Sequence, residues 1–122
     1  MIKIDEIVNL ADQYAKHKWS LRRILLTDRW FGDVSEEMRA QFPETDVSLH
    51  EIDALWFSRK NKDSETWELR RIGSPPFALV EVIEDTVSKE ERENRLAFLE
   101  HEMADQSYRP SNFGSEIPNG NL

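Results

Sequence analysis

Three apolar-rich stretches follow one another in the second half of the chain and decide its fold: ALWFSRK (54–60), TWELRRI (66–72) and FALVEVIE (77–84). Side chains alternate between the two faces of a strand, and the first stretch is apolar on both faces, with Trp56 on one and Leu55 and Phe57 on the other. This pattern predicts a central strand that is covered on both sides. The second stretch alternates apolar and charged residues, as a half-solvated strand does.

The connections between these stretches are short and prone to turns. Residues 61–64 read Asn-Lys-Asp-Ser, and residues 73–76 read Gly-Ser-Pro-Pro, in which neither proline can donate to a ladder. Short connections predict an antiparallel meander. Residues 19–27 (WSLRRILLT) are short, without a helix cap, and predict one more strand. We therefore expect a four-stranded, mostly antiparallel sheet.

One helix is predicted on each side of the strand region. Apolar residues recur at spacings of three and four between Ile4 and His17, with Asp5 as an N-cap. A capping box at 88–91 (SKEE) begins a second helix that extends to about Asp105. The fold class is therefore α+β, with a single domain over residues 1–105 and an irregular C-terminal tail over residues 106–122.

The middle of the chain is harder to assign. Residues 28–32 (DRWFG) read as a loop, followed by a short helix that starts at Asp33 or Ser35 and ends before Pro43. Residues 48–51 (SLHE) match a capping box and predict one helical turn that ends near Asp53. A longer helix that extends to about Phe57 is the alternative.

Composition limits the class of protein. The 122 residues contain no cysteine, are 33% charged and carry a formal net charge of −8. Without a signal peptide or an apolar run of about 20 residues, we expect a cytoplasmic protein with no membrane association. Binding of nucleic acid depends on basic side chains that neutralise phosphates, so this charge argues against a nucleic-acid partner.

No catalytic or cofactor-binding signature is present. The three histidines have no metal-binding spacing, so we expect no metal and no cofactor. His50 and Asp53 are a possible acid–base pair, although His50 is explained more simply by the capped turn. We therefore predict no catalytic residue, and an enzyme is the less favoured interpretation.

Two arginine pairs, at 22–23 and 70–71, are candidates for anion binding. Neighbouring strand residues point to opposite faces, so only one arginine of each pair can contribute to a given surface. Arg23 and Arg71 on adjacent strands, with His50 nearby, would form a fork for a carboxylate or phosphate. Cross-strand pairing of these arginines with Glu68 and Glu81 is the alternative, and it is favoured.

The preferred hypothesis is a non-enzymatic protein-interaction module, such as a toxin-neutralising immunity protein or a regulatory adaptor. Trp30 and Phe31, placed on a loop, would anchor the interface, and the net charge favours a basic protein partner. The acidic residues beside these aromatics, Asp33, Glu36 and Glu37, would contact that partner. The other interpretation of such carboxylates is that they only stabilise helix N-termini.

Overall fold

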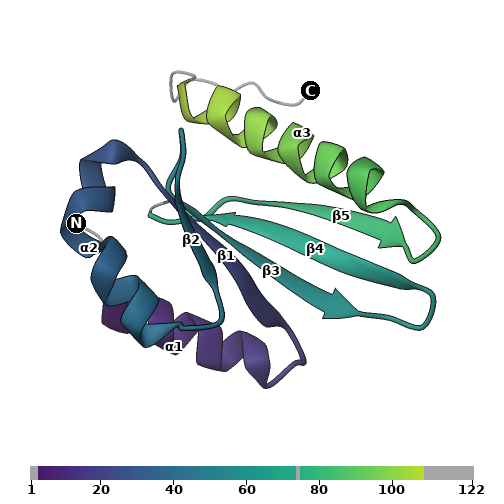
Figure 1. Cartoon of the computed structure of the whole chain (residues 1–122), viewed down its shortest axis with the longest axis horizontal. Helices are drawn as coiled ribbons and strands as arrows, with labels where there is room; N and C mark the ends of the chain where they lie inside the picture. Colours follow the sequence, from purple (N-terminus) through teal and green to yellow (C-terminus); the bar gives the residue numbers. More distant parts are fainter. Residues whose placement is uncertain (1–2, 74, 109–122) are drawn as a thin grey trace.

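The computed structural model describes residues 3–73 and 75–108, which form an α+β fold with a five-stranded mixed sheet and three helices (Figure 1). In chain order the elements are α1 (Ile4–Ala15), β1 (Ser20–Leu26), α2 (Asp28–Gln41), β2 (Asp46–Leu49), β3 (Ala54–Lys60), β4 (Ser64–Arg71), β5 (Ala78–Glu84) and α3 (Lys89–Tyr108).

The sheet has the strand order β2-β1-β3-β4-β5. β1 and β2 are parallel, and every other neighbouring pair is antiparallel. The first five residues of β3 are buried, as expected for a strand covered on both faces. The predicted meander from β3 to β5 and the strand at β1 are therefore confirmed.

β2 is the strand that the sequence did not reveal. Residues 48–51 were expected to form a helical turn, but Asp46–Leu49 pairs with the second half of β1. Only Val47 of this short strand is buried, so it lacks the alternating pattern by which a strand is recognised. Parallel pairing also requires a crossover, and α2 provides it. The expected sheet of four strands therefore lacked one strand, the edge strand β2.

The helices differ from expectation at their ends. α2 begins at Asp28, so residues 28–32 are helical and the predicted loop is wrong. Lys3, without a side-chain cap, precedes α1, so Asp5 is not its N-cap. The capping serine of α3 is confirmed, because the hydroxyl oxygen of Ser88 accepts a 3.0 Å hydrogen bond from the backbone N–H of Glu91. α3 extends three residues beyond the predicted end, and the remainder of the predicted tail lies outside the described residues.

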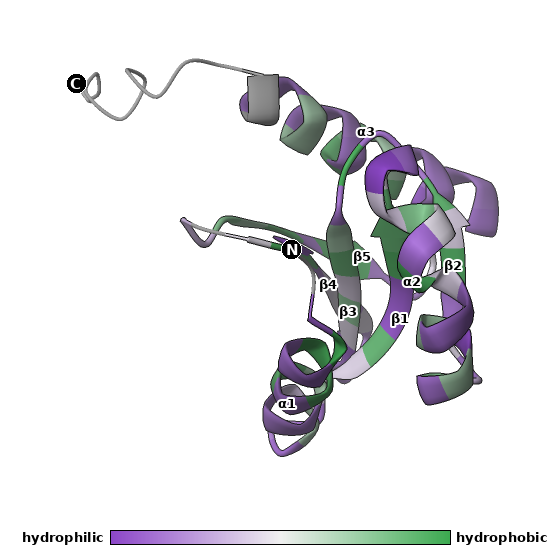
Figure 2. Cartoon of the chain, turned by 90° about the vertical axis from the view of Figure 1, so that its left-hand side faces the viewer, coloured by the Kyte–Doolittle hydropathy of each residue, from purple (hydrophilic) through white to green (hydrophobic). Residues whose placement is uncertain are grey.

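The sheet separates two apolar cores. On one face, α3 packs through Leu96, Leu99 and Met103 against a layer that contains Trp56 and Trp67. On the other face, α1 and α2 pack against a layer built from β1, β2 and β3, which includes Ile24, Leu26, Val47, Leu55 and Phe57. Figure 2 shows α1 and α3 on opposite sides of the sheet.

The regular alternation of β1 is interrupted near its start. Leu21 pairs with Phe57 and Arg23 pairs with Trp56, so Arg22 is the extra residue of a β-bulge. A bulge changes the direction of the side chains beside it. As a result, Arg22 and Arg23 reach the same face of the sheet, contrary to the expectation from regular alternation.

Candidate functional site

The N-terminus of α2 is fixed to the loop before β3. The backbone N–H of Thr27 donates to Oδ1 of Asp53 at 2.8 Å, and the Thr27 hydroxyl lies 3.3 Å from Oδ2. These bonds use the carboxylate that was considered as the acid–base partner of His50. Asp53 therefore holds α2 at the end of β1.

The two aromatic residues of α2 face inward. Trp30 and Phe31 are half-buried and pack against the core shared by α1 and α2. The guanidinium of Arg29 lies 5.2 Å from the Trp30 ring centre, and that of Arg39 lies 5.4 Å from Phe31. The predicted anchors thus present only part of their rings, and their role in partner binding stays a prediction.

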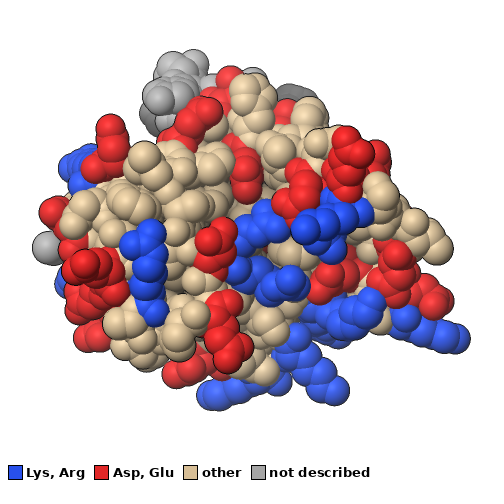
Figure 3. Space-filling view, viewed as in Figure 1, with Lys and Arg blue, Asp and Glu red and all other residues tan. Residues whose placement is uncertain are grey.

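The three acidic residues predicted to bind a partner lie together on the outer side of α2. Asp33, Glu36 and Glu37 are exposed, and none takes part in the ion pairs found among the described residues. Residues 28–46 contain six acidic and two basic residues, which gives a net charge of −4. Acidic side chains predominate over α2, on the left of Figure 3.

The two basic residues in that range do not neutralise this charge. Arg29 and Arg39 stack on the aromatics, and Arg39 also donates to the backbone oxygen of Val47 at 3.3 Å. Some carboxylates elsewhere pair with Lys or Arg, namely Glu65, Glu81, Glu84, Asp85 and Glu93, and Glu100 is bonded to His50. The outer side of α2 is therefore one region where exposed acidic groups have no ion-pair partner among the described residues.

His50 belongs to a hydrogen-bonded group that joins α3 to the sheet. Its Nε2 lies 2.9 Å from Oε1 of Glu100, and Oε2 of Glu100 accepts a 2.7 Å hydrogen bond from the Trp56 indole. The Nδ1 atom of His50 is buried and has no hydrogen-bond partner among the described residues. The Glu100 carboxylate is the main contact of His50, and sequence reasoning missed it because the two residues are 50 positions apart.

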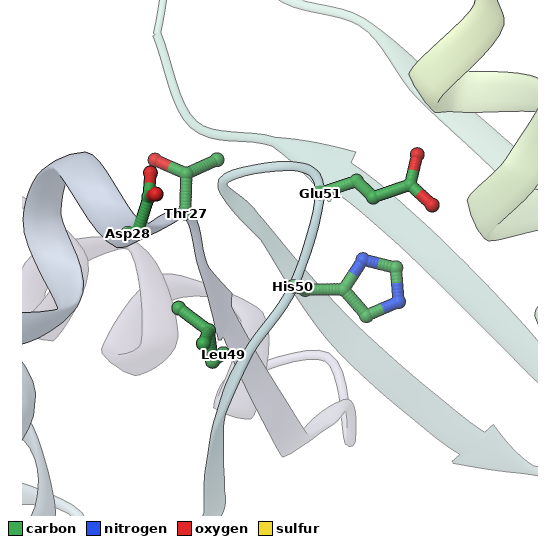
Figure 4. Close-up of a pocket in the computed structure, with 5 residues that line it drawn as sticks. All are labelled: Thr27, Asp28, Leu49, His50 and Glu51. Carbon is green, nitrogen blue, oxygen red and sulfur yellow. The ribbon is translucent and has the colours of Figure 1, made fainter.

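A shallow pocket of about 550 Å³ lies beside His50, at the ends of the two parallel strands. Its lining residues are Thr27, Asp28, Leu49, His50 and Glu51. Figure 4 shows the side chains of His50 and Glu51 extending away from Thr27 and Asp28, toward the side of α3. The only ionisable groups of this lining are two carboxylates and one histidine, so the pocket does not attract an anion.

The predicted fork of Arg23 and Arg71 does not form. The two residues lie on β1 and β4, and β3 separates these strands, so the assumption of adjacent strands was wrong. Arg71 donates to the backbone oxygen of Pro75 at 2.6 Å, and His50 is bound to Glu100. The structure does not bring the three predicted anion-binding residues together.

A different group of arginines surrounds Trp67. The guanidinium carbons of Arg22, Arg23 and Arg92 lie 4.8, 5.6 and 5.9 Å from the centre of its ring, and we call these three residues the arginine cluster. Arg22 and Arg23 reach it because of the bulge in β1, and Arg92 comes from α3. Sequence reasoning missed the cluster because a bulge leaves no signal in the residue pattern.

Two glutamates hold the arginine cluster in place. Oε2 of Glu65 lies 3.2 Å from Nη1 of Arg22, and Oε2 of Glu93 lies 2.9 Å from Nη2 of Arg23 and 3.4 Å from Nη2 of Arg92. The hydrogen bond from Arg23 is the largest of the effects that lower the pKa of Glu93 below its usual value. The favoured sequence interpretation named Glu68 and Glu81 as partners, whereas Glu81 pairs with Arg95 at 2.7 Å.

Comparison of the chain with protein-family models, curated proteins and solved structures found no match. Within residues 3–73 and 75–108, no group of three or more potential ligands could hold a metal ion. No helix in this part of the chain has the length and apolar character needed to cross a bilayer.

Proposed function

We propose that the protein is a non-enzymatic interaction module that binds a basic protein partner through the outer side of α2. The observation that carries this proposal is the uncompensated acidic surface formed by Asp33, Glu36 and Glu37. Clustered charge of one sign steers an oppositely charged partner during diffusion and so increases the rate of association.

The acidic residues of α2 lower the stability of the helix, and the packing of the core does not require them at these positions. Asp33 and Glu37 are four residues apart on one helix, a spacing at which like charges destabilise the helix by about 0.2–0.5 kcal/mol. The two arginines of the same helix contact aromatic rings instead of these acids. An arrangement that gives up local stability at exposed positions is expected where the side chains serve binding.

The surface is also rigidly supported, which lowers the entropic cost of binding. Met38 is fully buried and Trp30 and Phe31 pack against the same core, so the inner side of α2 is fixed. The Asp53 carboxylate fixes the start of α2, because it accepts a hydrogen bond from the backbone N–H of Thr27. A partner would therefore meet a preformed helix face.

The test is to capture a partner with the full-length protein and to measure its association rate at several salt concentrations. The variant Glu36→Lys/Glu37→Lys reverses two charges on α2. A matched control, Asp12→Lys/Glu102→Lys, reverses two exposed charges on α1 and α3. The proposal expects an association rate that falls with added salt and falls about tenfold in the α2 variant at low salt, with a much smaller change in the control.

Two results would reject the proposal. One is an association rate that is the same for the α2 variant and the wild type. The other is an equal decrease in both variants, which would show that net charge matters and the α2 surface does not.

A further inference from the structure

The arginine cluster has an excess of positive charge on a protein whose overall charge is negative. Three guanidinium groups face two carboxylates, Glu65 and Glu93, so one positive charge is left over. The three groups surround a single ring and therefore lie close enough to raise the local potential together. Figure 3 shows Lys and Arg gathered between α3 and the ends of β1 and β3.

The cluster is accessible and has donors to spare. The side chain of Arg22 is 42% exposed, and those of Arg23 and Arg92 are 24% and 31% exposed. Each guanidinium offers five N–H donors, and hydrogen bonds to side chains of the described residues use only Nη1 of Arg22, Nη2 of Arg23, and Nε and Nη2 of Arg92. Further N–H groups can therefore reach an external oxyanion.

Glu93 shows what kind of ligand the cluster accepts. One of its oxygens receives a 2.9 Å hydrogen bond from Arg23 and two longer ones, each of 3.4 Å, from Arg92. The carboxylate thus occupies the space between the two guanidinium groups as an oxyanion supplied by the chain itself. Its contacts with Arg92 are long, and its side chain is 38% exposed, so a ligand with more charge can displace it.

A pocket of about 410 Å³ adjoins the cluster at Arg22. Besides Arg22, its lining contains two more basic side chains, two carboxylates and two hydroxyl groups: Lys18, Lys60, Glu44, Glu65, Ser20 and Ser58. Its volume falls within the range of small-molecule sites, and its polar lining suits a sugar-like or nucleoside-like group better than an apolar one. Arg22 lines the pocket and also belongs to the cluster, which places the two next to each other.

We propose that the arginine cluster and this adjoining pocket bind a small organic phosphate monoester. The phosphate group lies against Arg22, Arg23 and Arg92 in place of the Glu93 carboxylate, and the remainder of the ligand occupies the pocket. Three guanidinium groups match a dianionic phosphate because each can donate two parallel hydrogen bonds. This site is separate from the acidic surface of α2, and its function does not depend on that surface.

The experiment is an NMR titration of the full-length protein with three probes at constant ionic strength: inorganic phosphate, glucose 6-phosphate and glucose. The reporters are the Nε–H signals of the arginines and the indole N–H of Trp67, assigned by comparison with Trp67→Phe. Both phosphates are expected to give saturable shifts of these signals, with tighter binding of glucose 6-phosphate, and glucose is expected to give none.

Two variants of the cluster, one control and one substitute variant test its role. Arg92→Ala should weaken the binding of glucose 6-phosphate about tenfold or more, because it removes one charge-assisted donor group. Glu93→Gln should strengthen it severalfold, because it removes the competing negative charge. Arg29→Ala, which removes an exposed arginine on α2, is the matched control and should leave the affinity unchanged. Arg22→Ala replaces Arg92→Ala if the latter loses the native spectrum.

The proposal is overturned if neither wild type nor Glu93→Gln shows saturable shifts with either phosphate. It is equally overturned if Arg92→Ala, or Arg22→Ala in its place, binds as tightly as the wild type. A single-stranded oligonucleotide is titrated in parallel, and binding of the oligonucleotide alone would identify a nucleic-acid surface and reject a small-molecule site.

Discussion

Trp56 and Trp67 provide a matched test of how buried indole groups stabilise this fold. Both side chains are fully buried on the face covered by α3, and their rings meet edge to face with centres 5.9 Å apart. They differ in one respect. The indole N–H of Trp56 donates to the Glu100 carboxylate at 2.7 Å, whereas that of Trp67 has no hydrogen-bond partner among the described residues.

Substitution of each tryptophan by phenylalanine separates the hydrogen bond from the packing. Both changes remove a similar volume from the same core, so the costs of the cavities largely cancel in the comparison. Trp56→Phe also removes a hydrogen bond to a charged group, worth about 1.5–3 kcal/mol. Trp67→Phe removes an unpaired buried donor whose desolvation costs about 1–3 kcal/mol, but it weakens contacts with three arginines worth about 0.5–1 kcal/mol each.

We therefore expect Trp56→Phe to lower the free energy of unfolding by about 2 kcal/mol more than Trp67→Phe does. Urea unfolding followed by far-UV circular dichroism measures both values without relying on tryptophan fluorescence. The slopes of the transitions must agree for the comparison to hold. A difference below about 1 kcal/mol, or one of opposite sign, would refute the assignment of hydrogen bonds in this core.

Three further predictions concern single side chains, each checked by unfolding measurements. Glu93→Gln should reduce the loss of stability on acidification. The hydrogen bond from Arg23 lowers the pKa of Glu93 in the folded state. The ionised Glu93 therefore stabilises the protein at pH values above the pKa that it has in the unfolded chain, and this stabilisation is lost as the pH falls through its pKa in the folded state. Tyr14→Phe should reduce the loss of stability above about pH 10, because burial raises the pKa of Tyr14 and the unfolded chain is deprotonated first. Ser88→Ala should cost about 1 kcal/mol through loss of the helix cap, whereas Thr86→Ala in the preceding turn should change stability by less than about 0.5 kcal/mol.

The strands of the meander were predictable because their local patterns agree with their tertiary surroundings. β3 is apolar on both faces and lies between two other strands, with α3 covering one face and the α1–α2 core the other. Trp67 and Leu69 alternate with polar residues in β4, and both are fully buried. Where burial follows from the position of a residue in its own strand, sequence periodicity is sufficient.

β2 and α2 could not be assigned in this way because their structure depends on distant partners. Residues 48–51 satisfy the pattern of a capping box, yet the parallel ladder with β1 determines their conformation. Gly32 and two adjacent aromatics indicated a loop, but the inward packing of Trp30 and Phe31 stabilises a helix over the same residues. Tertiary contacts overrode local propensity in both cases, through strand pairing at β2 and through inward packing at α2.

The strand order and a bulge in β1 account for the two errors about the arginines. The fork of Arg23 with Arg71 assumed adjacent strands, but β3 lies between β1 and β4, and regular alternation wrongly separated Arg22 from Arg23. One extra residue in the strand places both arginines over the same ring and directs Arg23 toward Glu93 of α3. No residue in the segment is a glycine or proline that would have indicated a bulge.

Net charge alone is a poor guide to the partners of this protein, because its charges are unevenly distributed and some of them are paired internally. Lys60 pairs with Asp85 and Arg95 with Glu81, so such groups contribute little to the field outside the protein. Unpaired acidic groups are clustered on α2 and excess positive charge is clustered around Trp67, and these regions lie on opposite faces of the sheet. A chain of net charge −8 can therefore present a surface for a basic protein and a separate site for a phosphate. What it binds is determined by which side chains are left without a partner after folding.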